Sequence, residues 1–378
     1  MLALLLGSLG LVAYVFVGYP AIMAVLARIA AKPVRGDDSF RPTVSLIIAA
    51  HNEAAVIDEK LDNVAALDYP REALQVIVAA DGSDDDTAER AARHPGVIAL
   101  HRPERLGKLA AINRALDAAT GEVLVFSDAN NLYSPNAVRE LVAPLADPTV
   151  GLVAGAKVID ASGGRSLDQA EGLYWRYESK LKEWESATGS AIGAPGEILA
   201  FRRQAYRTPE PGMLTEDFVQ AMLVAVDWRV VYAPRARSVE RASATMEDEA
   251  LRRSRLIVGR SQAMRALVPV LLRRNPRLAW RMVSHKGLRP VVPWALLTAA
   301  ASNLGLVRRH RPARALALAQ AAFYGLALLG WRDDRHGRRR KLTFLPFYFC
   351  RMNLASLRGL RDFAMGRREA TWARVKRG

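Results

Sequence analysis

The run from Met1 to Ala27 contains no charged side chain, and it restricts the possible folds more than any other feature. A helix of this length rises about 40 Å, at about 1.5 Å per residue, and exceeds the ~30 Å hydrocarbon core of a bilayer. A cleaved signal peptide is the alternative. It fits poorly, because no basic residue precedes the apolar run and the run is about twice the usual length. We therefore expect an uncleaved membrane anchor over residues 1–30.

The distribution of charge gives the orientation of this anchor. Arg28, Lys32 and Arg35 follow the apolar run, and the positive-inside rule then places the next domain in the cytosol. The chain carries 54 Lys and Arg against 38 Asp and Glu, and most of the basic excess lies after residue 235. Arginines that alternate with apolar segments favour an anionic membrane surface as the partner. Nucleic acid is not expected, because the sequence holds no known reading module.

Two further uncharged runs, Pro290–Val307 and Ala315–Trp331, are each near the minimum length of a membrane span. A hairpin of two membrane helices is one interpretation. The turn between the runs is rich in arginine, which conflicts with the positive-inside rule if the turn faces outward. Segments that enter the bilayer without crossing it are the other interpretation. The stretch Phe344–Leu357 is interrupted by Arg351 and is expected to lie at the interface.

Between these segments, short apolar runs of strand length alternate with segments of helical length. This pattern predicts βαβ units and a mainly parallel sheet that is covered on both faces. Strands are expected at 44–50, 74–80, 97–100 and 122–127, and helices at 53–67, 84–93 and 108–119.

Polar motifs follow three of the four predicted strands. They read HNE at 51–53, DGS at 81–83 and DAN at 128–130. Each motif alone is a common turn or helix cap. Because ligands of parallel sheets bind beyond the carboxyl ends of the strands, their repetition predicts a shared site at this edge.

Over roughly residues 40–265, the residues of these motifs and their order along the chain resemble those of family 2 glycosyltransferases. The similar segments are VSLIIAAHNE (44–53), VIVAADGSDDDT (76–87), GK (107–108) with AIN (111–113), FSDAN (126–130), GAPGEILAFRR (193–203) and TED (215–217). The resemblance implies an α/β GT-A fold of Rossmann-like type, a nucleotide-sugar donor, a divalent cation and inversion at the anomeric carbon. It favours a UDP-linked donor.

The resemblance also implies roles on the donor side of the site. The residues concerned are Ala50, Glu53, Asp81, Lys108 and Asp128. Asp81 would accept hydrogen bonds from the uracil or ribose. Lys108 opens a helix after a glycine, where a cation and free backbone N–H groups favour phosphate, although a solvated helix start has the same pattern.

Asp128 and Asn130 are the candidate metal ligands. Mg²⁺ or Mn²⁺ takes one or two carboxylates and completes its shell with the phosphates of the donor. Asn130 stands where the family has a second aspartate, which removes one negative charge from the expected site.

On the acceptor side, Asp217 matches the position of the family's general base. An inverting transfer needs one base, which removes the proton of the attacking hydroxyl. Glu216, Arg255 and Gln262 are the other candidates for acceptor or diphosphate binding. Guanidinium binds phosphate bidentately, although a helix lying on anionic lipid headgroups would use the same arginines. Processive members carry Gln-x-x-Arg-Trp here, and Ala266 replaces the tryptophan, which argues against long-chain polymerisation.

Apolar and aromatic residues recur at helical spacing between these motifs and predict a packing stripe without chemistry. The stripe consists of Leu167, Ala170, Tyr174, Tyr177, Leu181 and Trp184.

The expected organisation is an anchor at 1–30, a GT-A domain at 40–240, amphipathic or interfacial helices at 241–288, membrane segments at 289–360 and a basic tail at 361–378. The expected activity is transfer of a sugar to a lipid-linked or growing-glycan acceptor at the cytosolic face of the plasma (inner) membrane. A processive polysaccharide synthase that extrudes its product is the closest alternative. A silent scaffold subunit is the alternative from another class, and the retained Asp81, Asp128 and Asp217 argue against it.

Overall fold

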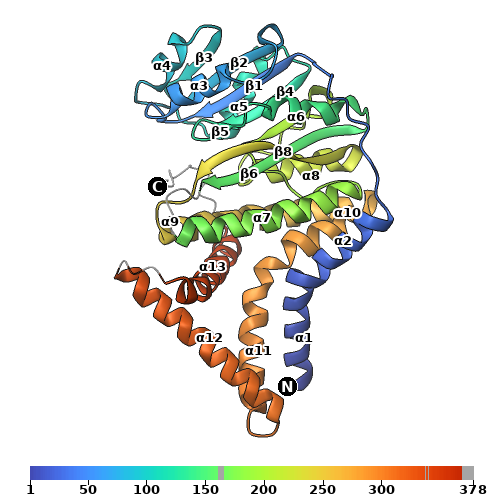
Figure 1. The fold of residues 1–378 in the computed structure, drawn as a ribbon, viewed down its shortest axis with the longest axis vertical. Coiled ribbons are helices and arrows are strands. Elements are labelled where there is room, and N and C mark those ends of the chain that lie inside the picture. Colours follow the sequence, from blue (N-terminus) through green and yellow to red (C-terminus); the bar gives the residue numbers. More distant parts are fainter. Residues whose placement is uncertain (161–165, 337, 339, 368–378) are drawn as a thin grey trace.

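A computed structural model describes residues 1–160, 166–336, 338 and 340–367. The part of the predicted basic tail beyond residue 367 lies outside the described residues. A layer of sheet and helices forms one end of the molecule, a second layer of helices lies beneath it, and a group of long helices projects from that layer (Figure 1).

The first half of the sheet confirms the predicted βαβ pattern. Four parallel strands lie in the order β3-β2-β1-β4, and every residue of the central strand β1 is buried. Continuous apolar strands are what a sheet covered on both faces requires. The elements are β1 (Val44–Ala50), α3 (Ile57–Ala65), β2 (Leu74–Asp81), α4 (Thr87–Arg93), β3 (Val97–Arg102), α5 (Lys108–Ala118) and β4 (Val123–Asp128).

Helices α3 and α4 begin later than predicted because side chains compete for their first backbone N–H groups. The N–H of Glu53 donates to Thr87 Oγ1 at 2.9 Å, and the N–H of Ala54 donates to Asp85 Oδ2 at 3.1 Å. The N–H of Thr87 donates to Asp85 Oδ1, which starts α4 at Thr87 rather than at residue 84. Asp and Thr side chains commonly divert the backbone in this way.

The second half of the sheet is mixed rather than parallel. β7 runs antiparallel to both β4 and β6, β6 and β8 are parallel, and the short β5 is antiparallel to β8. The mainly parallel sheet of the prediction is therefore found only in the first half of the sheet, β3-β2-β1-β4. The elements are β5 (Leu132–Tyr133), α6 (Ala137–Val142), β6 (Val150–Asp160), β7 (Leu199–Arg202), α8 (Glu216–Asp227) and β8 (Arg229–Arg241).

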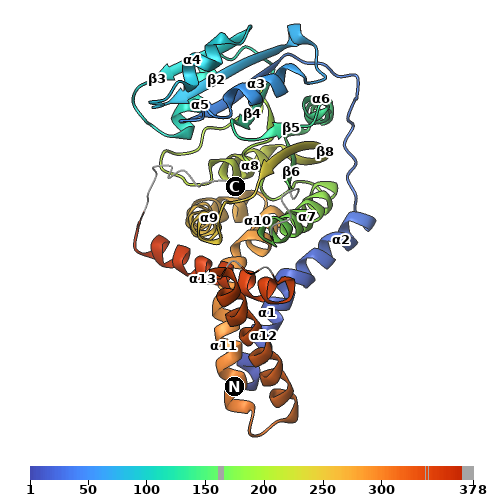
Figure 2. The same ribbon diagram turned by 60° about the vertical axis from the view of Figure 1, so that its left-hand side comes forward.

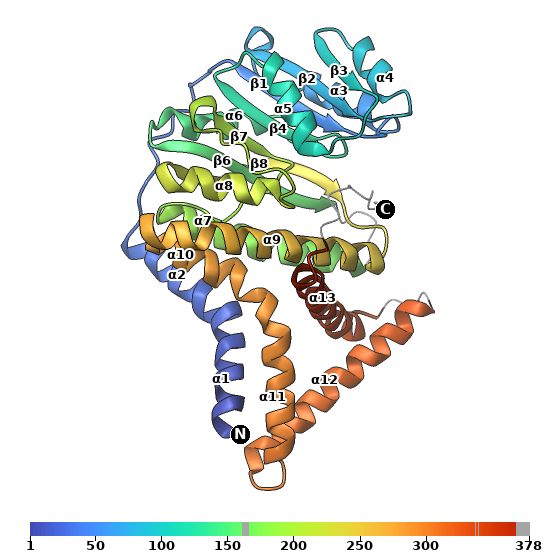
Figure 3. The same cartoon turned by 180° about the vertical axis from the view of Figure 1, so that it is seen from behind.

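Three helices form the layer beneath the sheet: α7 (Ser166–Ala187), α9 (Met246–Arg274) and α10 (Pro276–Met282). Viewed from behind, they lie between the sheet and the projecting helices (Figure 3). The predicted stripe on α7 does pack: Leu167 joins an apolar cluster with Phe347 and Met352, and Leu181 joins one with Tyr19 and Met23. Tyr174 is an exception, described below.

The N-terminal helix is continuous from Leu2 to Ile29 but contains one π-helical turn, Tyr14–Gly18, between α1 (Leu2–Ala13) and α2 (Tyr19–Ile29). Pro20 has no N–H with which to bond the carbonyl of Phe16 four residues earlier. The hydroxyl of Tyr177, on α7, donates to that carbonyl at 3.3 Å. The bend visible between α1 and α2 in Figure 1 is thus explained by Pro20, and the hydrogen bond from Tyr177 ties the N-terminal helix to α7.

The C-terminal region consists of α11 (Val292–Leu306), α12 (Arg311–Arg335) and α13 (Lys341–Ala364). Helices α11 and α12 form a hairpin whose tip lies near the N-terminus, and α13 returns to the layer containing α9 (Figure 2). Among the described residues, two helices are long and apolar enough to cross a membrane, Leu2–Ile29 and Arg311–Arg335. The predicted run at Pro290–Val307 is helical as α11, which is too short to pass that criterion.

Candidate active site

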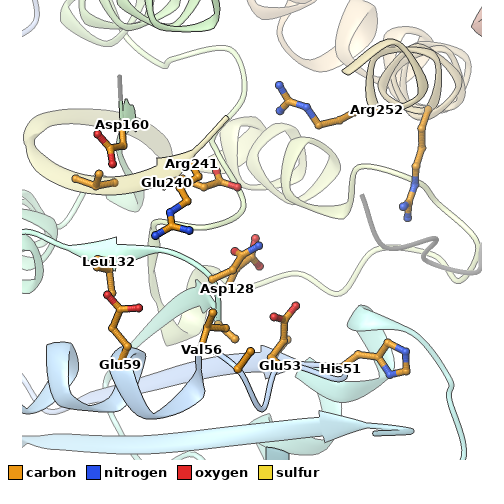
Figure 4. Close-up of a pocket in the computed structure, with 16 residues that line it drawn as sticks. His51, Glu53, Val56, Glu59, Asp128, Leu132, Asp160, Glu240, Arg241 and Arg252 are labelled. Atoms are coloured by element: carbon orange, nitrogen blue, oxygen red, sulfur yellow. The ribbon is translucent and has the colours of Figure 1, made fainter. Parts of the chain in front are cut away.

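A pocket of about 700 Å³ opens at the carboxyl ends of β1, β4, β6 and β8. It lies between the parallel half of the sheet and the mixed half. In Figure 4, Glu53 and Glu59 come from one wall, whereas Asp160, Glu240 and Arg241 come from the opposite wall. The polar lining residues are His51, Glu53, Glu59, Asp128, Asn130, Asp160, Glu240, Arg241, Arg252 and Arg255.

Two residues other than glycine have positive φ angles in the described chain: one lies between the pocket residues His51 and Glu53, and the other directly precedes α8. Asn52, in the HNE motif, has φ 55°, and Thr215, in the TED motif, has φ 77°. Such backbone costs free energy and persists where the surroundings hold it. Gly259 on α9 allows the second strained turn, because a Cβ there would lie 2.4 Å from the carbonyl oxygen of Leu214.

The carboxylate of Asp81, at the end of β2, holds the loop that precedes α5. Its Oδ1 accepts the N–H of Leu106 at 3.1 Å, and its Oδ2 accepts the N–H of Gly107 at 2.6 Å. Gly107 has a φ of 95°, which glycine adopts readily. Asp81 therefore places Lys108 at the first turn of α5. Its predicted contact with the nucleotide stays a prediction.

Lys108 lies between the predicted metal ligand Asp128 and the predicted base Asp217. Its Nζ donates to Asp128 Oδ1 at 2.5 Å. Burial lowers the pKa of Lys108, but Asp128, Glu216 and Asp217 together outweigh burial and raise it. The ammonium group is therefore kept charged between the predicted metal ligand and the predicted base.

The turn after β4 offers oxygen ligands for a divalent cation. The Oδ1 atom of Asn130 is buried without a hydrogen-bond partner in the described structure, and the neighbouring Asp128 lines the pocket. No group of three His, Cys, Asp or Glu side chains suited to hold a metal occurs among the described residues. Mg²⁺ or Mn²⁺ with one or two protein ligands and donor phosphates does not require one. The two side chains therefore fit a cation that is shared with the donor.

The contact between Lys60 and Asn131, which supports this turn, was not predicted from the sequence. Lys60, on α3, is fully buried, and its Nζ donates to the backbone oxygen of Asn131 at 2.9 Å and to Oδ1 at 2.7 Å. The amide of Asn131 in turn donates to the carbonyl of Glu197 and to Ser238 Oγ, both at 2.8 Å. Burial lowers the pKa of Lys60 to about 7. A lysine on the apolar face of an amphipathic helix was the available signal.

Asp217 lies in the first turn of α8, against the loop that contains Gly196. A Cβ placed on Gly196 would lie 3.2 Å from Asp217 Oδ2, so a side chain there would press on the carboxylate. Burial raises the pKa of Asp217 to about 6, and the negative charge of Glu216 acts in the same direction. A carboxylate with this pKa is ionised at neutral pH and remains basic enough to take a proton.

The other predicted residues divide between the pocket and the surrounding structure. Arg255 lines the pocket, and burial lowers its pKa although Glu216 opposes that effect. Gln262 is buried, and its Oε1 accepts the N–H of Leu214 at 3.0 Å, so its amide supports the TED loop. The side chain of Ala50 is buried in the core beneath the site, and only its backbone can face a ligand.

Residues 45–208 match the family model described as Glycosyl transferase family 2. An N-acetylglucosaminyltransferase of Rhizobium meliloti is 27% identical over 211 residues, which cover 52% of this chain and 49% of that protein. A beta-monoglucosyldiacylglycerol synthase of Trichormus variabilis is 29% identical over 178 residues, which cover 43% of this chain and 36% of that protein. The chain thus spans half or less of the length of these curated relatives.

A solved structure of another protein is similar to this chain over nearly the whole length of both. It is the mannosyltransferase PcManGT from Pyrobaculum calidifontis in complex with GDP-Man and Mn²⁺. The TM-score is 0.72 and the sequence identity is 28%, and the match covers 96% of this chain and 99% of that one. The GT-A fold predicted from the sequence is confirmed, together with the helices that precede and follow it.

Proposed function

We propose that this chain, which belongs to glycosyl transferase family 2 through its residues 45–208, is an inverting glycosyltransferase. It moves a hexosyl group from a nucleotide-sugar donor to a lipid-linked or glycan acceptor. The observation that carries the proposal is the position of Lys108, which pairs with the pocket residue Asp128 and lies close enough to Asp217 for the two charges to interact. A donor diphosphate beside the first two residues would bring its sugar toward the third.

In this mechanism, Asp217 removes the proton of the acceptor hydroxyl as that oxygen attacks the anomeric carbon. The bond from that carbon to the diphosphate breaks, and the proton ends on Asp217. Lys108 and Arg255 stabilise the negative charge of the leaving nucleoside diphosphate. Asp128 and Asn130 would hold a divalent cation, which supplies Lewis-acid neutralisation of phosphate charge when it is bound.

A single transfer is favoured over processive synthesis. Gln262 supports the TED loop, and alanine replaces the tryptophan of the processive motif, so neither residue offers the pattern expected of a polymerase. The two candidate spans among the described residues are few for a pore that would conduct a polysaccharide.

The protein is proposed to reside in the plasma membrane with its catalytic domain in the cytosol. The two long apolar helices and the basic residues after the first of them support this orientation. In inside-out vesicles, a protease added outside should digest the catalytic domain, and carbonate should leave the N-terminal helix in the membrane fraction. Digestion only in right-side-out vesicles would contradict the orientation.

The pKa of Asp217 predicts an acid limb in the pH profile of transfer. The base works in its ionised form, so kcat/KM should fall about tenfold per pH unit below pH ~6. Because the charge of Glu216 raises that pKa, Glu216→Gln should move the limb to lower pH. A profile that is flat between pH 5 and 7, or a limb that Glu216→Gln leaves in place, would contradict this role of the carboxylate.

The proposed activity is tested by incubating the purified protein in detergent with Mn²⁺ and a panel of UDP- and GDP-sugars. Release of nucleoside diphosphate should be selective for one donor and should depend on Asp128. The expectation of a UDP-linked donor came from the sequence, whereas the similar mannosyltransferase was solved with GDP-Man, so both bases belong in the panel. Absence of nucleotide release from every donor, with membrane lipid extract present as acceptor, would contradict the proposal.

A further inference from the structure

A group of cations, three of them buried and two (Arg253 and Arg260) partly exposed, lies between α7, α9 and the segment that leads into α11. We call it the cationic cluster, and it consists of Lys182, Arg253, Arg260, Lys286 and Arg289. Lys182, Lys286 and Arg289 are 3%, 5% and 6% exposed. Buried cations are rarely stable unless they are paired.

The carboxylates nearby do not balance these charges. Glu178 is the shared partner of Lys286, Arg289 and His285: Lys286 Nζ lies 2.5 Å from its Oε2, and the guanidinium of Arg289 contacts its Oε1. The second carboxylate, Glu185, is engaged by the hydroxyl of Tyr19 at 2.6 Å and by His285. Among the described residues, five cations therefore share three carboxylates, Glu178, Glu185 and Glu197, and Glu197 is itself paired with Lys157.

Several donor atoms of the cationic cluster are unsatisfied. Arg289 Nε and Nη2, Arg253 Nε and Arg260 Nη1 are buried without hydrogen-bond partners in the described part of the chain. Arg253 stacks over the ring of Tyr174, with 5.5 Å from the guanidinium carbon to the ring centroid. A buried donor without a partner is costly, so such a concentration indicates that an anion completes the arrangement.

The titration of the surrounding groups is consistent with a missing anion. Burial lowers the pKa of Lys286 to about 8, and the neighbouring Arg260 and Arg289 lower it further although Glu178 opposes them. Burial and Glu178 raise the pKa of Tyr174, but Arg253, Lys286 and Arg289 outweigh them and bring it to about 7. An anion among these groups would raise both values toward normal.

The position of the cationic cluster connects it to both the base and the membrane. The loop Gly193–Glu197 lies between them: a Cβ on Gly196 would touch Asp217, and a Cβ on Gly193 would lie 3.9 Å from Lys286 Cε. On the other side, Arg289 lies in the short turn Arg289–Val291, which leads directly into α11. The cluster is thus one loop away from the base, and its member Arg289 lies just before α11, one of the projecting helices in Figure 3.

We propose that the cationic cluster binds the phosphate or diphosphate of an anionic lipid acceptor, with the lipid tail toward α11 and the accepting hydroxyl toward Asp217. The inference rests on the proposed function and narrows it, because it excludes neutral glycerolipids and free glycans as the principal acceptors. Arginine is suited to this task, since its planar fork pairs with phosphate oxygens bidentately.

Two matched probes test the inference, farnesyl diphosphate and its neutral alcohol farnesol. The protein in detergent should bind the diphosphate at least tenfold more tightly than the alcohol, measured by microscale thermophoresis. Inorganic pyrophosphate distinguishes a lipid-linked anion from a free one and should bind more weakly than farnesyl diphosphate. Equal affinity for the diphosphate and the alcohol, or pyrophosphate binding as tight as that of the lipid, would overturn the inference.

Variants locate the binding in the cationic cluster rather than in the donor site. Arg260→Gln and Arg253→Gln should each weaken farnesyl diphosphate binding about tenfold to a hundredfold, as loss of a charge-assisted hydrogen bond does. Arg273→Gln, at an exposed arginine of the same helix, is the matched control and should change nothing. Asp128→Ala should leave lipid binding intact, because it acts on the donor.

A purely structural role for the arginines predicts a different result. Under the inference, Arg253 and Arg260 lie beside other cations, so Arg260→Gln and Arg253→Gln relieve repulsion and should unfold at the same or a higher temperature than the parent protein. A lower unfolding temperature with unchanged lipid binding would overturn the inference. Nucleotide-sugar turnover in the same preparation separates the two claims. Turnover without a preference for farnesyl diphosphate over farnesol would contradict the inference alone. Absence of turnover with every donor would contradict the proposed function.

Discussion

Asp217→Asn is expected to reduce sugar transfer by about 10²–10⁴-fold and to leave donor binding nearly unchanged. The amide keeps the shape of the carboxylate but cannot take the proton of the acceptor hydroxyl. Lys108 and Asp128, which face the donor, keep their 2.5 Å ion pair in this variant. Single-turnover rates and nucleotide dissociation constants, measured on the same preparation, separate the two effects.

Glu216→Gln is the control for that result, because it changes the adjacent position of the same helix turn. Its effect should be modest at neutral pH, since Glu216 acts on the pKa of Asp217 rather than on the proton transfer itself. A nearly normal rate for Asp217→Asn together with an inactive Glu216→Gln would show that Glu216, and not Asp217, is the base. Full activity in both variants would place the acceptor site elsewhere.

Asp128→Ala is expected to weaken Mn²⁺-dependent donor binding by at least about 100-fold. Loss of an outer-shell residue already costs 10–100-fold in metal affinity, and Asp128 is the only carboxylate in the DAN motif. Its removal also leaves Lys108 without its closest carboxylate. The measurement is titration of Mn²⁺ and of nucleotide, each with and without the other.

Asn130→Asp is the matched variant in the opposite direction. It adds a negative charge where the unpartnered Oδ1 of Asn130 lies, and it should tighten Mn²⁺ binding. Donor turnover that is unchanged by both a chelator and Asp128→Ala would contradict a role for a divalent cation.

The donor half of the fold was predictable because its signals are local. Each strand is a short apolar run with a polar motif at its carboxyl end, and β1 begins and ends at the predicted residues Val44 and Ala50. Helix starts were less accurate, since side chains such as Asp85 capture backbone N–H groups across a loop. The antiparallel β7 was not foreseen, because pairing direction depends on the route of the chain through α7.

The site was predictable where chemistry lies in a motif and unpredictable where it depends on packing. Asp128, Lys108 and Asp217 belong to recognisable motifs, and the fold brings them together around Lys108. Gln262 was expected near the ligand, whereas the structure places its amide against the backbone of Leu214. Tyr174 was assigned to a packing stripe, yet it contacts Arg253 and Arg289 because α9 and the turn before α11 meet α7 there.

The central claim is that one base, Asp217, drives a direct displacement at the anomeric carbon. The most direct test is the anomeric configuration of the first product, read by proton NMR from the coupling constant of the new glycosidic linkage. With an α-linked glucosyl or N-acetylglucosaminyl donor, the account predicts a β-linked product, formed about 10²–10⁴-fold more slowly by Asp217→Asn than by the parent protein. An α-linked product would contradict the account, because retention requires a different mechanism from a single displacement assisted by one base.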